Sequence, residues 1–422
     1  MSRLTISPTK DYFLRDGKPF FWMGDTLWSA FCRTSMNEWK QILHRRKQQG
    51  FNVIQIMVLP PWDRSRPDDG PFPFLTGTDG SPDFNRPNPE YFEEARKKLE
   101  YASKLGFIPA LAPVWVHEVE NTWGERTAPG TAMTKAQIEH YLDYIIPLFK
   151  PYAPVYLCSG DCRYESRQEI DLYAYILKKV HELDPEALTT LHPAPCEIPE
   201  ELLLDKNLDF YLFQSGHEAD QSNCRKMSEL YSARRNKKPV VNGEPCYEAS
   251  GHGNAHGRFT ERDVRRSVWT SLFSGAKAGV TYGAHGLWSM HRQESSFPSE
   301  QFSSLPPHWE SALFLRGADD MGWISYLYNE YEMWLANPVD LLCEKNEEIY
   351  VSAYADKSKV FIYAAYPNYL LLKGDFSGFQ ATAFALETRR VLNVTISEDD
   401  KGSRIEYPGD NYDILYVLER EN

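Results

Sequence analysis

"NEWKQILHRRKQQGFNVIQIMV", residues 37–58, contains the two kinds of element that decide the fold. Residues 37–50 carry apolar side chains at helical spacing from Trp39 onward and end on Gly50, a residue typical of helix ends. Residues 51–58 are almost continuously apolar, which is typical of a strand that is buried on both faces. The stretch therefore predicts a helix followed directly by a buried strand.

The same alternation repeats over roughly the first 300 residues. An apolar run that alternates with a helix eight times favours a (β/α)8 barrel, a TIM barrel of the α/β class. An open doubly wound sheet is the rival, but the glycine-rich first turn typical of that fold is missing. A hairpin is expected around Asp16-Gly17, before the first barrel strand. The expected strands are 20–26, 51–58, 107–116, 154–161, 188–193, 209–217, 239–245 and 279–286, and the further expected helices are 88–106, 134–149, 170–184, about 220–235 and 261–275.

The pattern changes after about residue 335. Short runs of alternating apolar and polar residues, separated by turn residues, replace the long helices. This pattern predicts a small antiparallel β-sandwich. We therefore expect a barrel domain over 1–335, which includes the N-terminal hairpin, and an accessory β-sandwich domain over 336–422. The second domain could bind glycan or brace the barrel, and we favour bracing.

Charge and composition exclude some functions. The net charge is −13, which argues against binding to nucleic acid or to an anionic membrane, since both need a basic surface. Aromatic residues reach 14% of the chain. They are expected either in an aromatic core or in a cleft that binds carbohydrate, because flat rings suit the faces of sugars.

The cysteines and the N-terminal region bear on location. Seven cysteines show no C-x-x-C spacing, and "MSRLTISPTKDYFLRDG" has no apolar core of a signal peptide. We expect a cytoplasmic protein with reduced thiols and with no membrane span, metal site or cofactor. The oligomeric state is left open.

Two acidic residues at strand ends are the first candidates for chemistry. Barrel enzymes build their active sites from the carboxyl ends of the strands. Asp161 ends the fourth strand and Glu244 the seventh, and these strands lie across the barrel mouth from each other. Each acid follows a glycine, which we expect to let a ligand approach the backbone. Glycoside hydrolysis needs such a pair of carboxylates. The alternative is that these acids cap helices or pair with Arg163 or Arg258.

Several blocks of sequence support a more specific interpretation. "GKPFFWMGDTLW" (17–28) resembles the opening of the apiosidase-like glycoside hydrolases, whose (β/α)8 domain is followed by a domain described as collagen-binding. The likeness covers most of the first 330 residues, in family order. The other blocks are "KQQGFNVIQ" (47–55), "SGD" (159–161), "QSGH" (214–217), "VNGEPCYE" (241–248), "TYGAHGLW" (281–288) and "HWESALFLRGADDM" (308–321).

The resemblance implies roles for individual residues. It makes Asp161 the acid/base and Glu244 the nucleophile, the same pair that the strand ends indicate. It also implies contacts to sugar hydroxyls from some of the strand-end residues. The expected substrate contacts from both lines of reasoning are Asp25, Trp28, Gln55, Trp115, His192, Gln214, His217, Tyr247, Tyr282, His285 and Trp288.

We therefore expect a glycoside hydrolase that removes a terminal sugar from pectin-like oligosaccharides by a retaining, two-carboxylate mechanism. The chain departs from the family pattern in having Cys158 and Ser159 where glycine is usual, and in lacking a signal sequence. Loops within 60–86 could wall off one end of the cleft and favour action at a chain end. The alternatives are another barrel glycosidase, of β-galactosidase or arabinofuranosidase type, and a non-catalytic carbohydrate-binding protein on the same fold.

Overall fold

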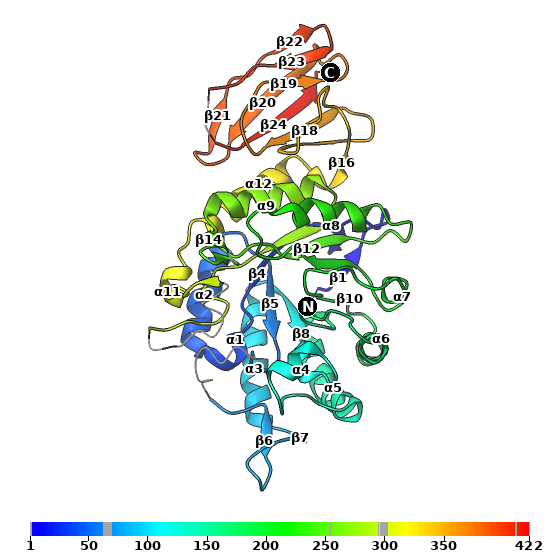
Figure 1. The fold of residues 1–422 in the computed structure, drawn as a ribbon, viewed down its shortest axis with the longest axis vertical. Coiled ribbons are helices and arrows are strands. Elements are labelled where there is room, and N and C mark those ends of the chain that lie inside the picture. The colour runs from blue at the N-terminus through cyan, green and yellow to red at the C-terminus, as the bar shows by residue number, and fades with distance from the viewer. Residues whose placement is uncertain are drawn as a thin grey trace.

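The computed structural model describes residues 2–61, 70–253, 255–293, 295, 303–409 and 412–421. Within these ranges, eight parallel strands form a central sheet that is surrounded by helices (Figure 1). Hydrogen-bonded neighbours follow the order β10, β9, β8, β5, β4, β15, β12 and β11. These strands are β4 (Trp22–Thr26), β5 (Val53–Met57), β8 (Ile108–Ala112), β9 (Val155–Leu157), β10 (Thr189–Thr190), β11 (Tyr211–Gln214), β12 (Val240–Glu244) and β15 (Gly279–Tyr282).

A short seam between β10 and β11 joins the two ends of this sheet. The Asp209 backbone N–H donates to the Thr189 carbonyl at 2.9 Å, and the Asp209 carboxylate accepts from the Thr189 N–H at 2.8 Å. The Thr190 hydroxyl donates to the Phe210 carbonyl at 2.7 Å. Side chains thus replace part of a strand ladder where β10 is only two residues long. The (β/α)8 fold class that the sequence predicts is confirmed.

The helices pack around the strands and begin at well-defined caps. In α2, Ser35 and Glu38 form a capping box, and Trp39, Ile42 and Leu43 face the core. The longer helices are α2 (Met36–Gln48), α3 (Pro89–Lys104), α5 (Lys135–Phe149), α6 (Arg167–Leu183), α8 (Ser222–Ser232), α9 (Glu261–Phe273) and α12 (Gly317–Glu330). The short ones are α1 (Ala30–Arg33), α4 (Trp123–Thr127), α7 (Glu200–Leu203), α11 (Trp309–Ala312), η1 (Val116–Glu118), η2 (Lys150–Tyr152) and η3 (Met333–Leu335).

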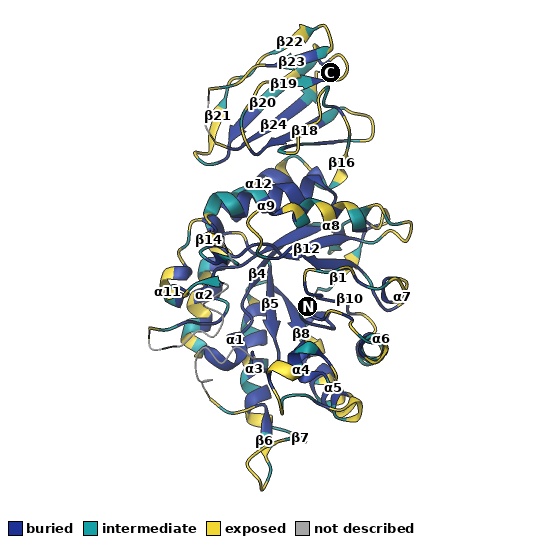
Figure 2. Cartoon of the chain, in the orientation of Figure 1, coloured by how far each residue is buried: buried dark blue, intermediate teal, exposed yellow. Residues whose placement is uncertain are grey.

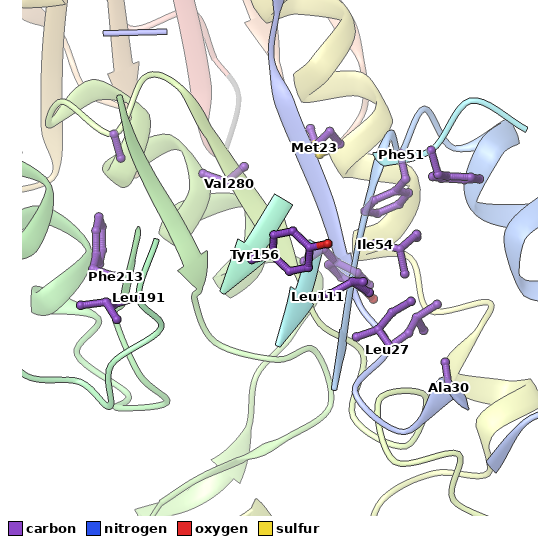
Figure 3. Close-up of a cluster of buried hydrophobic side chains, with 14 of the residues drawn as sticks. Met23, Leu27, Ala30, Phe51, Ile54, Leu111, Tyr156, Leu191, Phe213 and Val280 are labelled. Atoms are coloured by element: carbon purple, nitrogen blue, oxygen red, sulfur yellow. The ribbon is translucent and has the colours of Figure 1, made fainter. Parts of the chain in front are cut away.

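Alternate residues of each barrel strand face the interior of the barrel or the surrounding helices. In β5, Ile54 and Ile56 pack in the core between strands and helices, while Val53 and Met57 pack in the core inside the barrel. Figure 3 shows part of the outer core, including Ile54. Figure 2 shows that the barrel strands are buried along their length. The alternation therefore decides which side chains can reach the interior.

A small antiparallel sheet precedes the barrel. It consists of β1 (Leu4–Ile6), β2 (Phe13–Arg15) and β3 (Lys18–Phe20), so the expected hairpin is confirmed and a third strand is added. Asp16 and Gly17 both have positive φ, as a tight hairpin turn requires. Two further hairpins are β6 (Phe74–Thr76) with β7 (Pro82–Pro87), and β13 (Gly251–His252) with β14 (Ala255–Arg258).

Two antiparallel sheets form the C-terminal part of the chain, which lies against α9 and α12 in Figure 1. They share one hydrophobic core, to which Val360 and Ile362 contribute from one sheet and Leu372 and Ile405 from the other. The predicted β-sandwich is therefore confirmed. One sheet contains β16 (Asn337–Pro338), β17 (Ile349–Ala353), β18 (Lys359–Ala364), β24 (Ile414–Arg420), β20 (Phe379–Ala385) and β21 (Arg390–Leu392), and the other contains β19 (Leu370–Leu372), β23 (Gly402–Ile405) and β22 (Ile396–Asp399).

The domain division at residues 335 and 336 stays a prediction. Among the residues described, no helix combines the length and the apolar character needed to cross a lipid bilayer.

Candidate active site

The carboxylates of Asp161 and Glu244 come together where the barrel strands end. Asp161 follows β9, and Glu244 is the last residue of β12. One oxygen of each carboxylate and one ring nitrogen of His192 all lie within 4.8 Å of one another. The two acids therefore face the same small volume and can act on one substrate bond.

A β-bulge at Gly243 aims Glu244 into this volume. Val241 packs inside the barrel, so strict alternation would turn Gly243 inward and Glu244 outward. The register between β11 and β12 shifts between Phe213 and Gln214, so that Gln214 is paired with Glu244 and Gly243 has no partner in that register. A bulge of this kind re-aims a side chain, as bulges beside active sites commonly do.

Two neighbours hold the bulge. Gln55, on the inner face of β5, donates its amide N–H to the Gly243 carbonyl at 2.9 Å. Leu212 packs so closely that a Cβ on residue 243 would lie 2.5 Å from its Cδ2. The expectation that Gly243 opens space for a ligand is therefore wrong, because the Leu212 side chain fills that space.

Asp161 is held by tryptophans and an amide. Its φ of +49° lies in the left-handed region, and the Trp123 indole N–H donates to its carbonyl at 2.9 Å. The Trp115 indole lies 3.3 Å from Oδ2, and the Gln214 amide donates to Oδ1 at 3.0 Å. A Cβ on Gly160 would lie 1.8 Å from the Trp115 ring. The expectation that Gly160 lets a ligand approach is therefore also wrong, because the Trp115 ring fills the space beside it.

Two histidines face the carboxylates. His217 Nε2 lies 3.1 Å from Glu244 Oε1, and the Tyr247 backbone N–H donates to His217 Nδ1 at 3.3 Å. Because Nδ1 accepts this bond, we assign the proton of the neutral ring to Nε2, which then donates to Glu244. His192 lies between the two acids, with Nε2 3.4 Å from Glu244 Oε2 and Nδ1 4.0 Å from Asp161 Oδ1.

These surroundings move the two carboxyl pKa values apart. Burial and the nearby negative charge of Glu244 raise the pKa of Asp161 to about 6, although His192 and Gln214 partly oppose them. Burial alone would also raise the pKa of Glu244, but His192 and His217 outweigh it and lower that pKa to about 2. Near pH 6 the pair therefore holds an ionised Glu244 next to a carboxyl group that is readily protonated.

Aromatic rings adjoin the pair. The ring centroids of Trp28 and Trp115 lie 4.9 Å apart, and the Trp28 indole N–H donates to the Tyr247 hydroxyl at 3.0 Å. The Tyr247 ring lies edge-on to His217, and Trp288 packs against the same inner cluster as Trp28. Trp28, Trp115 and Tyr247 form an aromatic wall beside the carboxylates, and Trp288 lies against the same inner cluster.

Two of the expected substrate contacts do not reach the site. Asp25 lies two residues after Met23 and therefore shares the outer face of β4, where it is fully buried and pairs with Arg46 Nε at 2.6 Å. Tyr282 likewise faces outward, and its hydroxyl donates to Glu248 Oε2 at 2.6 Å. We therefore leave Asp25 and Tyr282 out of the contacts proposed below.

Two other expected contacts are tied to protein groups. Gln55 is fully buried and holds the bulge, as described above. His285 is buried, and its Nε2 lies 2.9 Å from the Ser304 carbonyl. Burial lowers the pKa of His285 to about 3, so this ring is neutral at physiological pH.

Three supporting residues are not among the expected substrate contacts. Trp123 fixes the Asp161 backbone, and Glu118 accepts from the Trp115 N–H at 2.6 Å. Glu248 accepts from Tyr282 and from the backbone of Gly317. The sequence offered a signal for each of them: Glu118 follows the third expected strand, Trp123 is one of several tryptophans that could stack on a sugar, and Glu248 lies in the same block as Glu244.

The same centre is the place where a metal ion could be held. Asp161, His192 and Glu244 form the one cluster of potential ligands found in the described part of the chain. Both oxygens of Asp161 and one of Glu244 already accept hydrogen bonds from the protein. We therefore assign no metal to the site.

Comparison with known proteins places the chain in a family. Residues 7–335 match the family model described as "Apiosidase-like, catalytic domain". A search of curated proteins found no match to the chain.

Solved structures share the fold. A structure titled "Glycoside hydrolase" superposes with a TM-score of 0.81 at 20% identity, covering 99% of this chain and 97% of that one. A glycoside hydrolase of family 5 from Bacteroides vulgatus superposes with a TM-score of 0.80 at 19% identity, covering 99% and 93%. These likenesses show the fold alone. Because the family model covers more than half of the chain, this protein belongs to the apiosidase-like family and is a glycoside hydrolase.

Proposed function

We propose that the protein removes a terminal sugar from pectin-like oligosaccharides with retention of anomeric configuration, with Glu244 as nucleophile and Asp161 as acid/base. The observation that carries this proposal is that one oxygen of Asp161 and one oxygen of Glu244 lie within 4.8 Å of each other. Retaining enzymes hold their carboxyl groups about 5–5.5 Å apart, whereas inverting enzymes need about 6.5–9.5 Å to admit a water. The short separation favours direct attack by Glu244.

In the first step, ionised Glu244 attacks the anomeric carbon. A bond forms between a Glu244 oxygen and that carbon while the glycosidic bond breaks. Protonated Asp161 gives its proton to the leaving oxygen. The lowered pKa of Glu244 and the raised pKa of Asp161 match these roles.

In the second step, Asp161 works as a base. Once Glu244 is an ester, it no longer carries the negative charge that helps to raise the pKa of Asp161. The pKa of Asp161 then falls, and its carboxylate takes a proton from the water that hydrolyses the intermediate. The same pair of residues thus supplies both halves of the reaction.

The aromatic wall supports a sugar substrate. We propose that Trp28, Trp115, Tyr247 and Trp288 pack on the sugar, with Gln214, His192 and His217 holding the carboxylates and contacting hydroxyl groups. Of loop 60–86, residues 62–69 lie outside the described residues. The described remainder lines a cavity of about 650 Å³ with residues after β5 and β8, including His117 and Glu118. Asp161 and Glu244 do not line this cavity, so action on a terminal sugar stays a prediction from the sequence.

The cysteines support a reducing compartment. All seven are free thiols, and five of them are buried. We propose that the protein acts in the cytoplasm.

A substrate screen tests the proposed function. Wild type, Glu244→Gln and the control Glu310→Gln, whose side chain is exposed, are compared on aryl glycosides and pectin-derived oligosaccharides. We expect wild type and the control to cleave the same glycoside, and the Glu244 variant to lose at least about 1,000-fold in kcat. A Glu244→Gln variant with wild-type activity would show that Glu244 is not the nucleophile. Sugar binding without any hydrolysis by wild type would favour a binding protein.

A further inference from the structure

The segment 245–248, here named the nucleophile loop, follows Glu244 and is tied down at its far end by Glu248. The Glu248 backbone N–H donates to the Gly283 carbonyl at 2.9 Å, and its carbonyl accepts from the His285 N–H at 2.9 Å. The residue is only 4% exposed. A buried carboxylate here needs partners, because an unpaired one is costly.

The Glu248 carboxylate finds these partners on the neighbouring strand and on α12. Oε2 accepts from the Tyr282 hydroxyl at 2.6 Å and from the Gly317 backbone N–H at 2.9 Å. Gly317 is the first residue of α12, where free N–H groups and the helix dipole favour an anion. A Cβ on Gly317 would lie 2.5 Å from Oε2, so the approach requires glycine. Glu248 therefore joins the nucleophile loop to the start of α12.

The first turn of α12 is joined in turn to the C-terminal strands. Asp320 accepts from Arg265 Nη1 at 2.7 Å, and Arg265 is fully buried. The same guanidinium contacts Asp413 at 3.0 Å and Glu387 at 2.5 Å. Asp413 directly precedes β24, and Glu387 lies two residues past the end of β20. One buried cation thus holds the barrel helices α9 and α12 against the C-terminal sheet.

This chain of contacts also reaches the nucleophile itself. Tyr247 directly precedes Glu248, and its backbone N–H donates to His217 Nδ1. That bond fixes the tautomer in which His217 Nε2 donates to Glu244. A shift of the nucleophile loop would therefore weaken the hydrogen bond that orients Glu244 and favours its ionised form.

We propose that Glu248 is a positioning residue that fastens the nucleophile loop to α12, and that Arg265 and Asp320 extend this support to the C-terminal strands. The C-terminal part of the chain would then serve the reaction as a brace. This inference rests on the proposed function of Glu244.

The test uses full-length Glu248→Gln, which keeps the size of the side chain. Glu38→Gln is the matched control, because Glu38 also accepts a backbone N–H at a helix start but lies on α2. We expect kcat of the Glu248 variant to fall about 10- to 100-fold with KM nearly unchanged. The acidic limb of its kcat/KM profile should move to higher pH, since Glu244 loses support for its ionised form. Equal kinetics in both variants would overturn the proposal.

A double-mutant cycle tests the link to the C-terminal strands. Asp413→Asn should lower kcat in the same direction, and Glu248→Gln with Asp413→Asn should be little worse than Glu248→Gln alone. Independent, multiplying effects would contradict the link. If Asp413→Asn does not fold, Glu387→Gln replaces it, because Glu387 contacts the same Arg265 guanidinium.

A measurement without substrate separates this inference from the proposed function. Nitrogen-15 NMR should show His217 as the Nε2–H tautomer in wild type and a changed signal in Glu248→Gln. An unchanged His217 signal would overturn the positioning role even if the enzyme is active. A wild type that hydrolyses nothing would refute the proposed function. The NMR result would then decide by itself whether Glu248 positions the nucleophile loop.

Discussion

Replacing Gly243 with alanine tests how the bulge serves the reaction. The added Cβ would lie 2.5, 2.6 and 2.8 Å from three carbon atoms of Leu212. Gly243 is not among the glycines with positive φ, so the strain of an alanine is steric and not conformational. We expect Gly243→Ala to lower the free energy of unfolding by about 1–3 kcal/mol, as overpacking in cores does. We expect kcat/KM to fall at least about 10-fold, because the shifted carbonyl loses Gln55 and Glu244 moves.

The compensating variant is Leu212→Ala. This change removes all three clashing atoms and leaves a cavity that costs about 2–5 kcal/mol by itself. In the double variant the new methyl group has room, so kcat/KM should return toward that of Leu212→Ala. Denaturant unfolding gives the stability and steady-state assays give the activity. A Gly243→Ala variant that behaves like wild type, or a double variant as inactive as Gly243→Ala, would show that contact with Leu212 does not set the position of Glu244.

Three further predictions concern single carboxyl groups. The kcat/KM of wild type should fall as pH rises above about 6, because Asp161 must be protonated to act as acid, and Asp161→Asn should lose this basic limb together with most activity. Burial raises the pKa of Glu118 to about 8, above its value in the unfolded chain. The contribution of protonated Glu118 to the free energy of unfolding is therefore complete below about pH 4.5 and is lost as pH rises to about 8. Glu118→Gln should therefore unfold like wild type at pH 4 but be more stable at pH 9, on the order of 2–4 kcal/mol in urea titrations; no gain at pH 9 would contradict this. Asp25→Asn leaves buried Arg46 without its charged partner and should cost about 3–5 kcal/mol while KM stays within about twofold, whereas a large rise in KM would restore Asp25 as a substrate contact.

The barrel could be predicted because its strands carry a strong signal. Runs such as 51–58 are apolar on both faces, and the helices between them have clear caps, as Ser35 shows. The seam at Thr189 and Asp209 carries no such signal, since a side chain completes it. Only the three-dimensional structure shows how the barrel closes.

The candidate site was predictable in position but not in orientation. Asp25 and Tyr282 lie at strand ends, yet each comes two residues after an outward apolar residue and so shares its face; counting from Met23 and Val280 could have excluded both. The same count would have excluded Glu244, whose inward direction depends on a bulge. Alternation therefore helps only in regular strands, and bulges cannot be read from one sequence.

The glycines beside the two acids show a second limit. A glycine in a sequence indicates that little space is available or that the backbone is unusual, but it does not say what fills the space. Trp115 fills it at Gly160 and Leu212 at Gly243. Both partners are distant in sequence from the glycines they contact.

Proton NMR of the first product formed shows whether the reaction retains or inverts the anomeric configuration. Wild type is mixed with an aryl glycoside that it hydrolyses and whose anomeric configuration is known. The anomeric signal of the released sugar is then followed before mutarotation. Because one oxygen of Asp161 lies within 4.8 Å of one oxygen of Glu244, we expect the sugar to appear first with the configuration of the substrate. First appearance of the opposite anomer would rule out direct attack by Glu244, because inversion requires a water between the two carboxylates.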